Sequence, residues 1–238
     1  MSGSSLFSRS SSWLGVLLGL VVCGLPTLAL AQFNPPSRGT PGRREGGGSR
    51  DPLACVKGNP ASLIALSPEK NFGLTTSEYP RFFWFQPSNR AQYAEFSLYQ
   101  GDQRMPNRTL IYKTTFRISD QAGIASVALP KSAGVPPLQL GKDYHWTVAL
   151  VCDAEIPQLN ITVDGWVQRV QTLAPETRSS NPQERAALLA QKGIWFDALE
   201  AQAEQRCLKP NNPAEGWTKL LQAVKLDKIA SQPILCWK

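Results

Sequence analysis

The chain has 238 residues, a formal net charge of +7 and a single histidine, His145. One histidine excludes zinc sites of the HExxH type, which need two on one helix. The positive charge does not indicate a nucleic-acid surface, because residues 32–50 carry four arginines against one glutamate while residues 51–175 are nearly neutral.

Residues 1–31 have the pattern of a cleavable export signal. An apolar run over residues 13–25 leads to the small residues Ala29 and Ala31, which fit a peptidase site. An uncleaved anchor and a lipoprotein with lipid on Cys23 are the alternatives, but the run is shorter than the roughly 20 residues that span a bilayer. We therefore expect an exported protein of the periplasm, cell envelope or extracellular space, with no transmembrane anchor after cleavage.

Residues 32–50 are predicted to form a disordered basic arm rich in Pro, Gly and Arg. The stretch FNPPSRGTPGRREGGGSRD has no aliphatic side chain to bury. Its glycines follow no strand and precede no lysine, so no phosphate loop and no cofactor are expected. The arm is expected to be a solvated tether or a contact for an envelope protein or an acidic polysaccharide; nucleic acid is not expected outside the cell membrane. The candidate contacts are Arg38, Arg43, Arg44 and Arg50.

Residues 51–175 are predicted to form an immunoglobulin-like or fibronectin III-like β-sandwich. Short β-rich runs separated by turn residues are typical of a sandwich and not of strand–helix alternation. In the run from Tyr144 to Leu150, large apolar groups alternate with His, Thr and Ala, which predicts one buried face. The preceding Leu138 to Tyr144 resembles a tyrosine corner, in which the phenol bonds to upstream backbone. The runs are 63–66, 81–85, 93–99, 110–118, 125–129, 144–152 and 161–170.

Residues 176–238 are predicted to be helical, with helices over 182–191, 194–208 and 213–224. The stretches 181–184 and 212–215 each supply an N-cap, a proline and a capping acid, and Gly193 ends the first helix. The small residues are spaced as in one tetratricopeptide (TPR) unit, although solenoids need about three units. The simplest interpretation is a TPR-like helical hairpin that packs on itself or on the sandwich, and a peptide-binding groove is the alternative.

Four cysteines follow the expected cleavage site, namely Cys55, Cys152, Cys207 and Cys236. An exported chain meets oxidising conditions, so disulfides are expected. No CxxC pair and no Cys/His cluster indicates a metal site, so no metal ligand is predicted. Three pairings are open, and Cys55–Cys152 with Cys207–Cys236 is favoured because each bond then lies within one predicted region.

No catalytic residue is predicted. His145 is expected on the outer, solvent-facing side of its strand, and no GxSxG serine accompanies it. A glycan hydrolase would need two paired acids, for which Asp153, Glu155 and Asp164 are candidates, but Asp164 before Gly165 more simply marks a β-bulge. The favoured interpretation is a non-enzymatic binding or interaction protein. An envelope glycan hydrolase and a structural or assembly component of an envelope complex are the alternatives.

Four motifs, in this order, resemble a cyanobacterial family of exported proteins known as domain of unknown function 928. The resemblance covers essentially the whole chain after the signal, and it implies a periplasmic or envelope setting. It implies no activity, substrate or catalytic residue. The motifs are residues 43–48 (RREGGG), 144–153 (YHWTVALVCD), 165–170 (GWVQRV) and 193–199 (GIWFDAL).

Overall fold

A computed structural model of the chain describes residues 33–39, 42–46, 55–57, 62–101, 108–172, 181–211 and 214–237. Residues 1–31, the predicted signal, lie outside them. Within the described residues, each predicted run corresponds to a strand and each predicted helix is present. The strands are β1 (Ile64–Ala65), β2 (Phe72–Thr75), β3 (Arg81–Gln86), β4 (Tyr93–Gln100), β5 (Thr109–Arg117), β6 (Gly123–Ala128), β7 (Asp143–Val151) and β8 (Ile161–Arg169). The helices are α1 (Pro182–Gln191), α2 (Trp195–Leu208) and α3 (Glu215–Gln222), with short 3-10 turns at Pro157–Leu159 and Asp227–Ile229.

The strands form two sheets, so the fold is mainly β with C-terminal helices. One sheet has the order β1-β3-β6 and the other has the order β2-β8-β7-β4-β5. The inner faces meet in an aromatic core, where the ring centroid of Phe82 lies 5.1 Å from that of Phe96 and 5.4 Å from that of Trp146. Burial of such large rings supplies much of the hydrophobic stabilisation of a sandwich.

Strand β2 was not predicted. It is only four residues long, contains Gly73, and pairs in parallel with β8, so that Phe72 lies opposite Trp166. A short strand with a glycine has little local signal. Its partner is more than 80 residues further along the chain, and the sequence pattern does not reveal such a pairing.

The predicted bulge at Asp164 and Gly165 is wrong. Strands β7 and β8 pair without interruption, with Gly165 opposite Trp146. A Cβ atom on Gly165 would lie 2.8 Å from the Trp146 indole, so the glycine leaves room for that buried ring. The register shift of the sheet lies instead between Leu98 and Tyr99 of β4.

The loop before β7 has the predicted tyrosine hydrogen bond. The backbone N–H of Gln139 donates to the hydroxyl oxygen of Tyr144 at 2.9 Å. Gly141, between them, has a positive φ of 70°, a conformation that glycine adopts without a steric penalty. This bond fixes the entry into the central strand of the large sheet.

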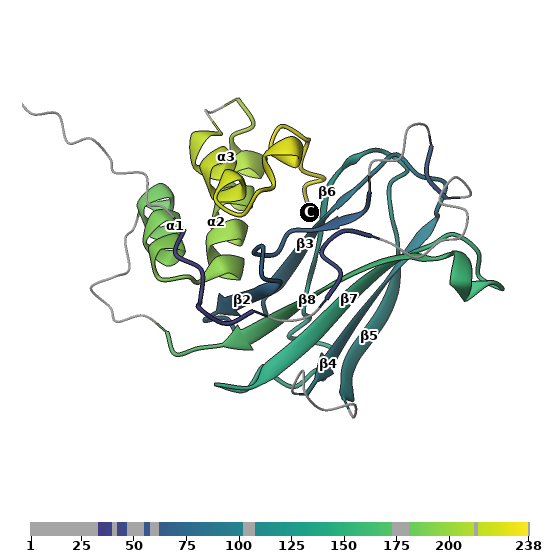
Figure 1. The fold of residues 1–238 in the computed structure, drawn as a ribbon, viewed down its shortest axis with the longest axis horizontal. Coiled ribbons are helices and arrows are strands. Elements are labelled where there is room, and N and C mark those ends of the chain that lie inside the picture. Colours follow the sequence, from purple (N-terminus) through teal and green to yellow (C-terminus); the bar gives the residue numbers. More distant parts are fainter. Residues whose placement is uncertain are drawn as a thin grey trace, which may run out of the picture.

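The helices gather at one end of the sheets, beside β2 and β3 (Figure 1). Trp195 of α2 is fully buried, and its indole N–H donates to the carbonyl oxygen of Leu66 at 2.8 Å. The ring of Phe196 packs edge-on against Phe82 at 5.4 Å. A Cβ atom on Gly73 would come 2.8 Å from Phe196. Helices and sheets therefore share one core, in agreement with the expected packing of the hairpin on the sandwich.

Both favoured disulfides are present. Cys55 is bonded to Cys152, and Cys207 is bonded to Cys236. The second bond ties α2 to the C-terminal segment 233–237, which also pairs with the edge strand β6: Ile124 N–H donates to Pro233 O, and Leu235 N–H donates to Ile124 O, each at 2.8 Å. The C-terminus is thus fastened to the small sheet.

Candidate functional site

The described residues of the predicted arm lie against the folded body. We call residues 33–39 and 42–46 the N-terminal strap. Phe33 is only 4% exposed, and its ring lies 5.0 Å from that of Trp195. The N–H of Asn34 donates to Ala190 O of α1 at 3.1 Å. This part of the segment therefore differs from the free, disordered arm expected from its composition.

The strap joins the two sheets through its backbone, at β8 of the large sheet and at β1 of the small one. Asp164 N–H of β8 donates to Arg43 O at 2.9 Å, while Ala65 N–H of β1 donates to Arg44 O at 2.7 Å. Gly46 N–H donates to Leu63 O at 2.6 Å. These bonds need no aliphatic side chains, which is why composition did not reveal them.

The arginines predicted to contact an anion lie in different environments and have different binding partners. The guanidinium of Arg38 makes two hydrogen bonds to the Asp143 carboxylate, and it lies 4.7 Å above the ring of Phe72. Arg43 donates its backbone N–H to Asp164 at 2.9 Å. Arg44 donates to the carbonyl oxygens of Val224 at 2.6 Å and Lys225 at 3.3 Å.

Arg44 therefore caps the turn that follows α3, and burial lowers the pKa of its guanidinium. Arg38 and Arg44 already bind groups of the folded body, Arg38 at the surface and Arg44 partly buried, and they are not grouped on one anion-binding surface. Arg50 lies outside the described residues.

An aromatic row crosses the outer face of the large sheet. The strand register places Phe72 of β2, Trp166 of β8, His145 of β7 and Tyr99 of β4 side by side. The ring centroids of His145 and Trp166 are 4.8 Å apart, and those of His145 and Tyr99 are 6.5 Å apart. The aromatic row thus lies on the outer face of the large sheet, next to the N-terminal strap.

The expected solvent exposure of His145 is wrong, although its outer-face position is right. Only 9% of the residue is exposed. Its Nδ1 lies 2.8 Å from Nη1 of Arg108, and its Nε2 lies 3.4 Å from Asp164. Arginine can only donate, so Nδ1 accepts and the neutral ring carries its hydrogen on Nε2, facing Asp164. Both ring nitrogens are engaged, which leaves neither in place to act as a general base.

Asp164 is held as a carboxylate. Burial raises its pKa, but hydrogen bonds from His145, the N–H of Arg43 and the amide of Asn71 outweigh this and keep the pKa below its usual value. The Asn71 amide donates to it at 3.2 Å. Asp164 therefore serves as the common acceptor of a polar network and not as a proton donor at neutral pH.

The acids proposed for a hydrolase are not brought together. Asp164 lies opposite Thr147, whereas Asp153 and Glu155 follow the end of β7 at Val151. Four residues of strand span roughly 13 Å, which exceeds the about 5 to 9.5 Å between glycosidase carboxyls. Asp153 instead accepts the backbone N–H of Glu155 at 2.7 Å, an interaction internal to its loop. The part of the chain that the structure describes holds no cluster of ligands suited to a metal ion.

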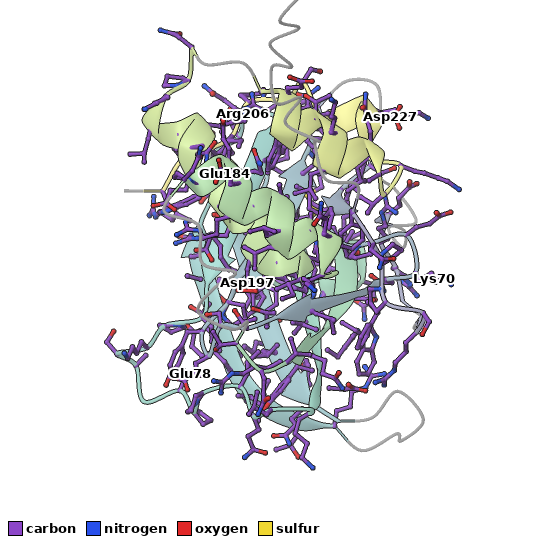
Figure 2. All side chains as sticks on the ribbon, turned by 90° about the vertical axis from the view of Figure 1, so that its left-hand side faces the viewer. Lys70, Glu78, Glu184, Asp197, Arg206 and Asp227 are labelled. Carbon is purple, nitrogen blue, oxygen red and sulfur yellow. A yellow bond between two sulfur atoms is a disulfide. The ribbon has the colours of Figure 1, made fainter. Side chains whose placement is uncertain are left out.

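A groove of about 1070 Å³ lies among α1, α2 and α3, and we call it the helical groove. Figure 2 looks onto this helical layer and labels Glu184 and Arg206 of its lining. Leu208, at the end of α2, is 73% exposed, which makes it the most exposed large hydrophobic side chain among the described residues. The small lining residues are Ala186, Ala187, Ala190, Ala214 and Gly216.

Small side chains explain why the groove is hollow. A Cβ atom on Gly216 would come 2.7 Å from the amide of Gln202, so the glycine lets α2 and α3 approach closely. Side-chain amides line the same groove, and each of them both donates and accepts hydrogen bonds. They belong to Asn181, Gln183, Gln191, Gln202 and Gln205.

A peptide-binding groove was the alternative interpretation of the helices and stays a prediction, whereas Arg108 was not predicted as a site residue. Arg108 precedes β5 in a stretch without a motif, and its partners come from β7 and β8. The alternation in β7 places His145 on the outer face, but only the cross-strand register identifies its neighbours.

Comparison with known proteins identifies a family and no individual relative. The model of the family described as Domain of Unknown Function (DUF928) matches residues 45–234. No curated protein and no solved structure matches the chain. No helix in the described ranges is long and apolar enough to cross a membrane.

Proposed function

Because the chain belongs to the Domain of Unknown Function (DUF928) family, we propose its function from its own geometry: an exported, non-enzymatic protein that binds a partner in the cell envelope or periplasm. The helical groove is the observation that carries this proposal. At about 1070 Å³ its volume slightly exceeds the roughly 300 to 1,000 Å³ typical of ligand sites. It therefore offers room for more than a small metabolite.

The chemistry of the groove favours an extended segment of a partner protein. A polypeptide backbone presents alternating donors and acceptors, and the amides of Gln202 and Gln205 can meet both kinds. Lys219 and Glu215 pair with each other at 2.7 Å, so their charges offset one another. The alanine-lined floor and Leu208 suit small apolar side chains of the partner.

Export is part of the same proposal. Its supports are the signal-like residues 1–31 and the two disulfides, which persist in oxidising compartments. The immunoglobulin-like interpretation of the sandwich rests on the bond from Gln139 to Tyr144. The TPR-like interpretation of the hairpin rests on the short turn at Gly193, whose φ is 73°.

Leu208→Asp is expected to weaken partner capture. Burying a leucine contributes about 1.5 to 3 kcal/mol, so its replacement by a charged residue should weaken binding at least tenfold. Purified wild type and variant are immobilised and exposed to an extract of exported proteins from the source cells. The affinity of the purified captured protein is then measured by calorimetry.

Leu140→Asp is the matched control, since Leu140 is 49% exposed but lies on the sandwich. It should capture the same partner with unchanged affinity. Equal capture by the Leu208→Asp variant, or equal loss in the Leu140→Asp variant, contradicts a groove-based function.

A further inference from the structure

Two guanidinium groups lie on the aromatic row of the large sheet. That of Arg38 is 4.7 Å from the Phe72 ring, and that of Arg108 is 4.9 Å from the Trp166 ring. Both arginines are exposed at the surface. Stacking on an aromatic face holds a guanidinium in a fixed plane and leaves its edge available for hydrogen bonds.

The charges of these two arginines are compensated differently. Arg38 forms an ion pair with Asp143 through two hydrogen bonds. Arg108 donates to His145, whose ring is neutral in this tautomer. Among the described residues, no carboxylate is in ion-pair contact with Arg108. Within the described ranges, Arg108 is thus a cation held by His145 and Trp166 that keeps further N–H donors.

A buried hydrogen-bond chain sets the direction of Arg108. Ser67 donates to the Asn71 oxygen at 2.9 Å, and the Asn71 amide donates to Asp164 at 3.2 Å. Asp164 faces His145, which faces Arg108. Asn71 is buried and has a φ of 56°, the left-handed region that non-glycine residues rarely adopt. Asparagine adopts this region more readily than other non-glycine residues, and here its side chain bonds both Ser67 and Asp164.

We propose that Arg108 binds the carboxylate of an acidic glycan, with Tyr99 and Leu110 as the shelf for the sugar ring. Tyr99 pairs with both His145 and Leu110 across the sheet, and Leu110 is 50% exposed. A planar carboxylate matches the two-pronged edge of a guanidinium, and its single charge matches that of Arg108, which has no ion-pair partner among the described residues. An amphipathic ring packs on an aromatic face. Uronic-acid units combine both features, and this site shares no residue with the helical groove.

Titration of the full-length exported protein with a galacturonic-acid hexamer, followed by calorimetry, tests this site. Wild type should bind saturably and should not bind a neutral glucose hexamer. Arg108→Gln should lower the affinity at least tenfold. Arg108→Lys, which keeps the charge and loses the planar edge, should lower it at least threefold.

Arg117→Gln is the matched control, because Arg117 lies 5.6 Å from the Tyr93 ring on β4 and β5 of the same sheet. It should bind the hexamer like wild type, as should the Leu208→Asp variant. The proposal is overturned by the absence of saturable binding, by unchanged affinity in both Arg108 variants, or by an equal loss in the Arg117→Gln variant. That last result would indicate general attraction to a basic protein.

Discussion

Replacing both Cys55 and Cys152 with serine is expected to lower the free energy of unfolding by about 4.7 kcal/mol. The bond joins residues separated by 97 positions, and the loop-closure entropy of an unfolded chain increases with the length of the closed loop. Small domains are stable by only about 5 to 15 kcal/mol in total. The loss should therefore be visible as a large shift of the urea unfolding midpoint.

The second disulfide provides the internal comparison. Cys207 and Cys236 are separated by 29 positions, for which the same relation gives about 3.6 kcal/mol. The double serine variant at these positions should therefore be more stable than the variant at Cys55 and Cys152. Equal or reversed losses would show that loop length does not decide the contribution of these bonds.

The Cys55–Cys152 bond also fastens a short piece of chain to the sandwich. Lys57 N–H donates to Ser88 O at 2.8 Å, and Arg90 N–H donates to Cys55 O at 2.7 Å. These few backbone bonds and the disulfide hold residues 55–57 against the loop before β4. Loss of the bond should therefore increase hydrogen exchange first in this segment.

Asp197→Asn is expected to remove a pH dependence of stability. Asp197 lies in the first turn of α2, between the helices and β2 (Figure 2). Its carboxylate accepts from Thr76 N–H at 2.8 Å and from the Thr75 hydroxyl at 3.2 Å. Part of the residue reaches the surface, but protein atoms surround the carboxyl group. This burial raises its pKa to about 6, against the opposing effect of the hydrogen bonds.

A carboxyl whose pKa is higher in the folded state stabilises the fold when it is protonated. Its contribution is complete below the unfolded value of 3.8 and is lost as the pH rises through about 6. The shift corresponds to at most about 3 kcal/mol. Because Asn carries no charge, the difference in unfolding free energy between variant and wild type should move in favour of the variant between pH 4 and pH 7.

Urea unfolding of both proteins at pH 4, 5, 6 and 7 measures that difference. Taking the difference cancels the pH dependence of the carboxyls that do not interact with Asp197. Glu200, whose burial raises its own pKa and whose charge also raises that of Asp197, is coupled to it, so the slope of the difference reports on Asp197 together with this coupling. In the Asn variant one carboxylate oxygen that can accept from Thr76 is lost. This loss changes the unfolding free energy of the variant by the same amount at each pH, so it does not alter how the difference depends on pH. A difference that stays flat across this range would contradict the assigned role of Asp197.

Much of the fold follows from local patterns. Alternation of apolar and polar residues places β7 and its buried face, and the Asn181 cap with Pro182 places the start of α1. The N-terminal strap could not be predicted, because main-chain hydrogen bonds, the ring of Phe33 and the distant partners of Arg38 and Arg44 hold it. Amino-acid composition describes side chains only. It therefore does not distinguish a segment held by backbone hydrogen bonds from a segment that is free in solvent.

The two candidate sites differ in how far the sequence predicts them. The helical groove is lined by small residues at α1 and α3, whereas the TPR-like spacing of the sequence lies at Gly193, Ala198, Ala203 and Pro210, which do not line it. The environment of His145 depends on Arg108, Trp166 and Asp164, which come from other strands or loops. The periodicity of one strand gives the face of a residue but not its neighbours across the sheet.

A photo-activated cross-linking residue at position 205 tests the central claim most directly. Gln205 lines the helical groove, whereas Lys131 is exposed in the loop after β6 and serves as the control position. In intact source cells, illumination should join position 205, and not position 131, to one polypeptide segment of an exported protein. Absence of a cross-link at position 205, or equal cross-linking from both positions, would contradict a partner-binding function of the helical groove.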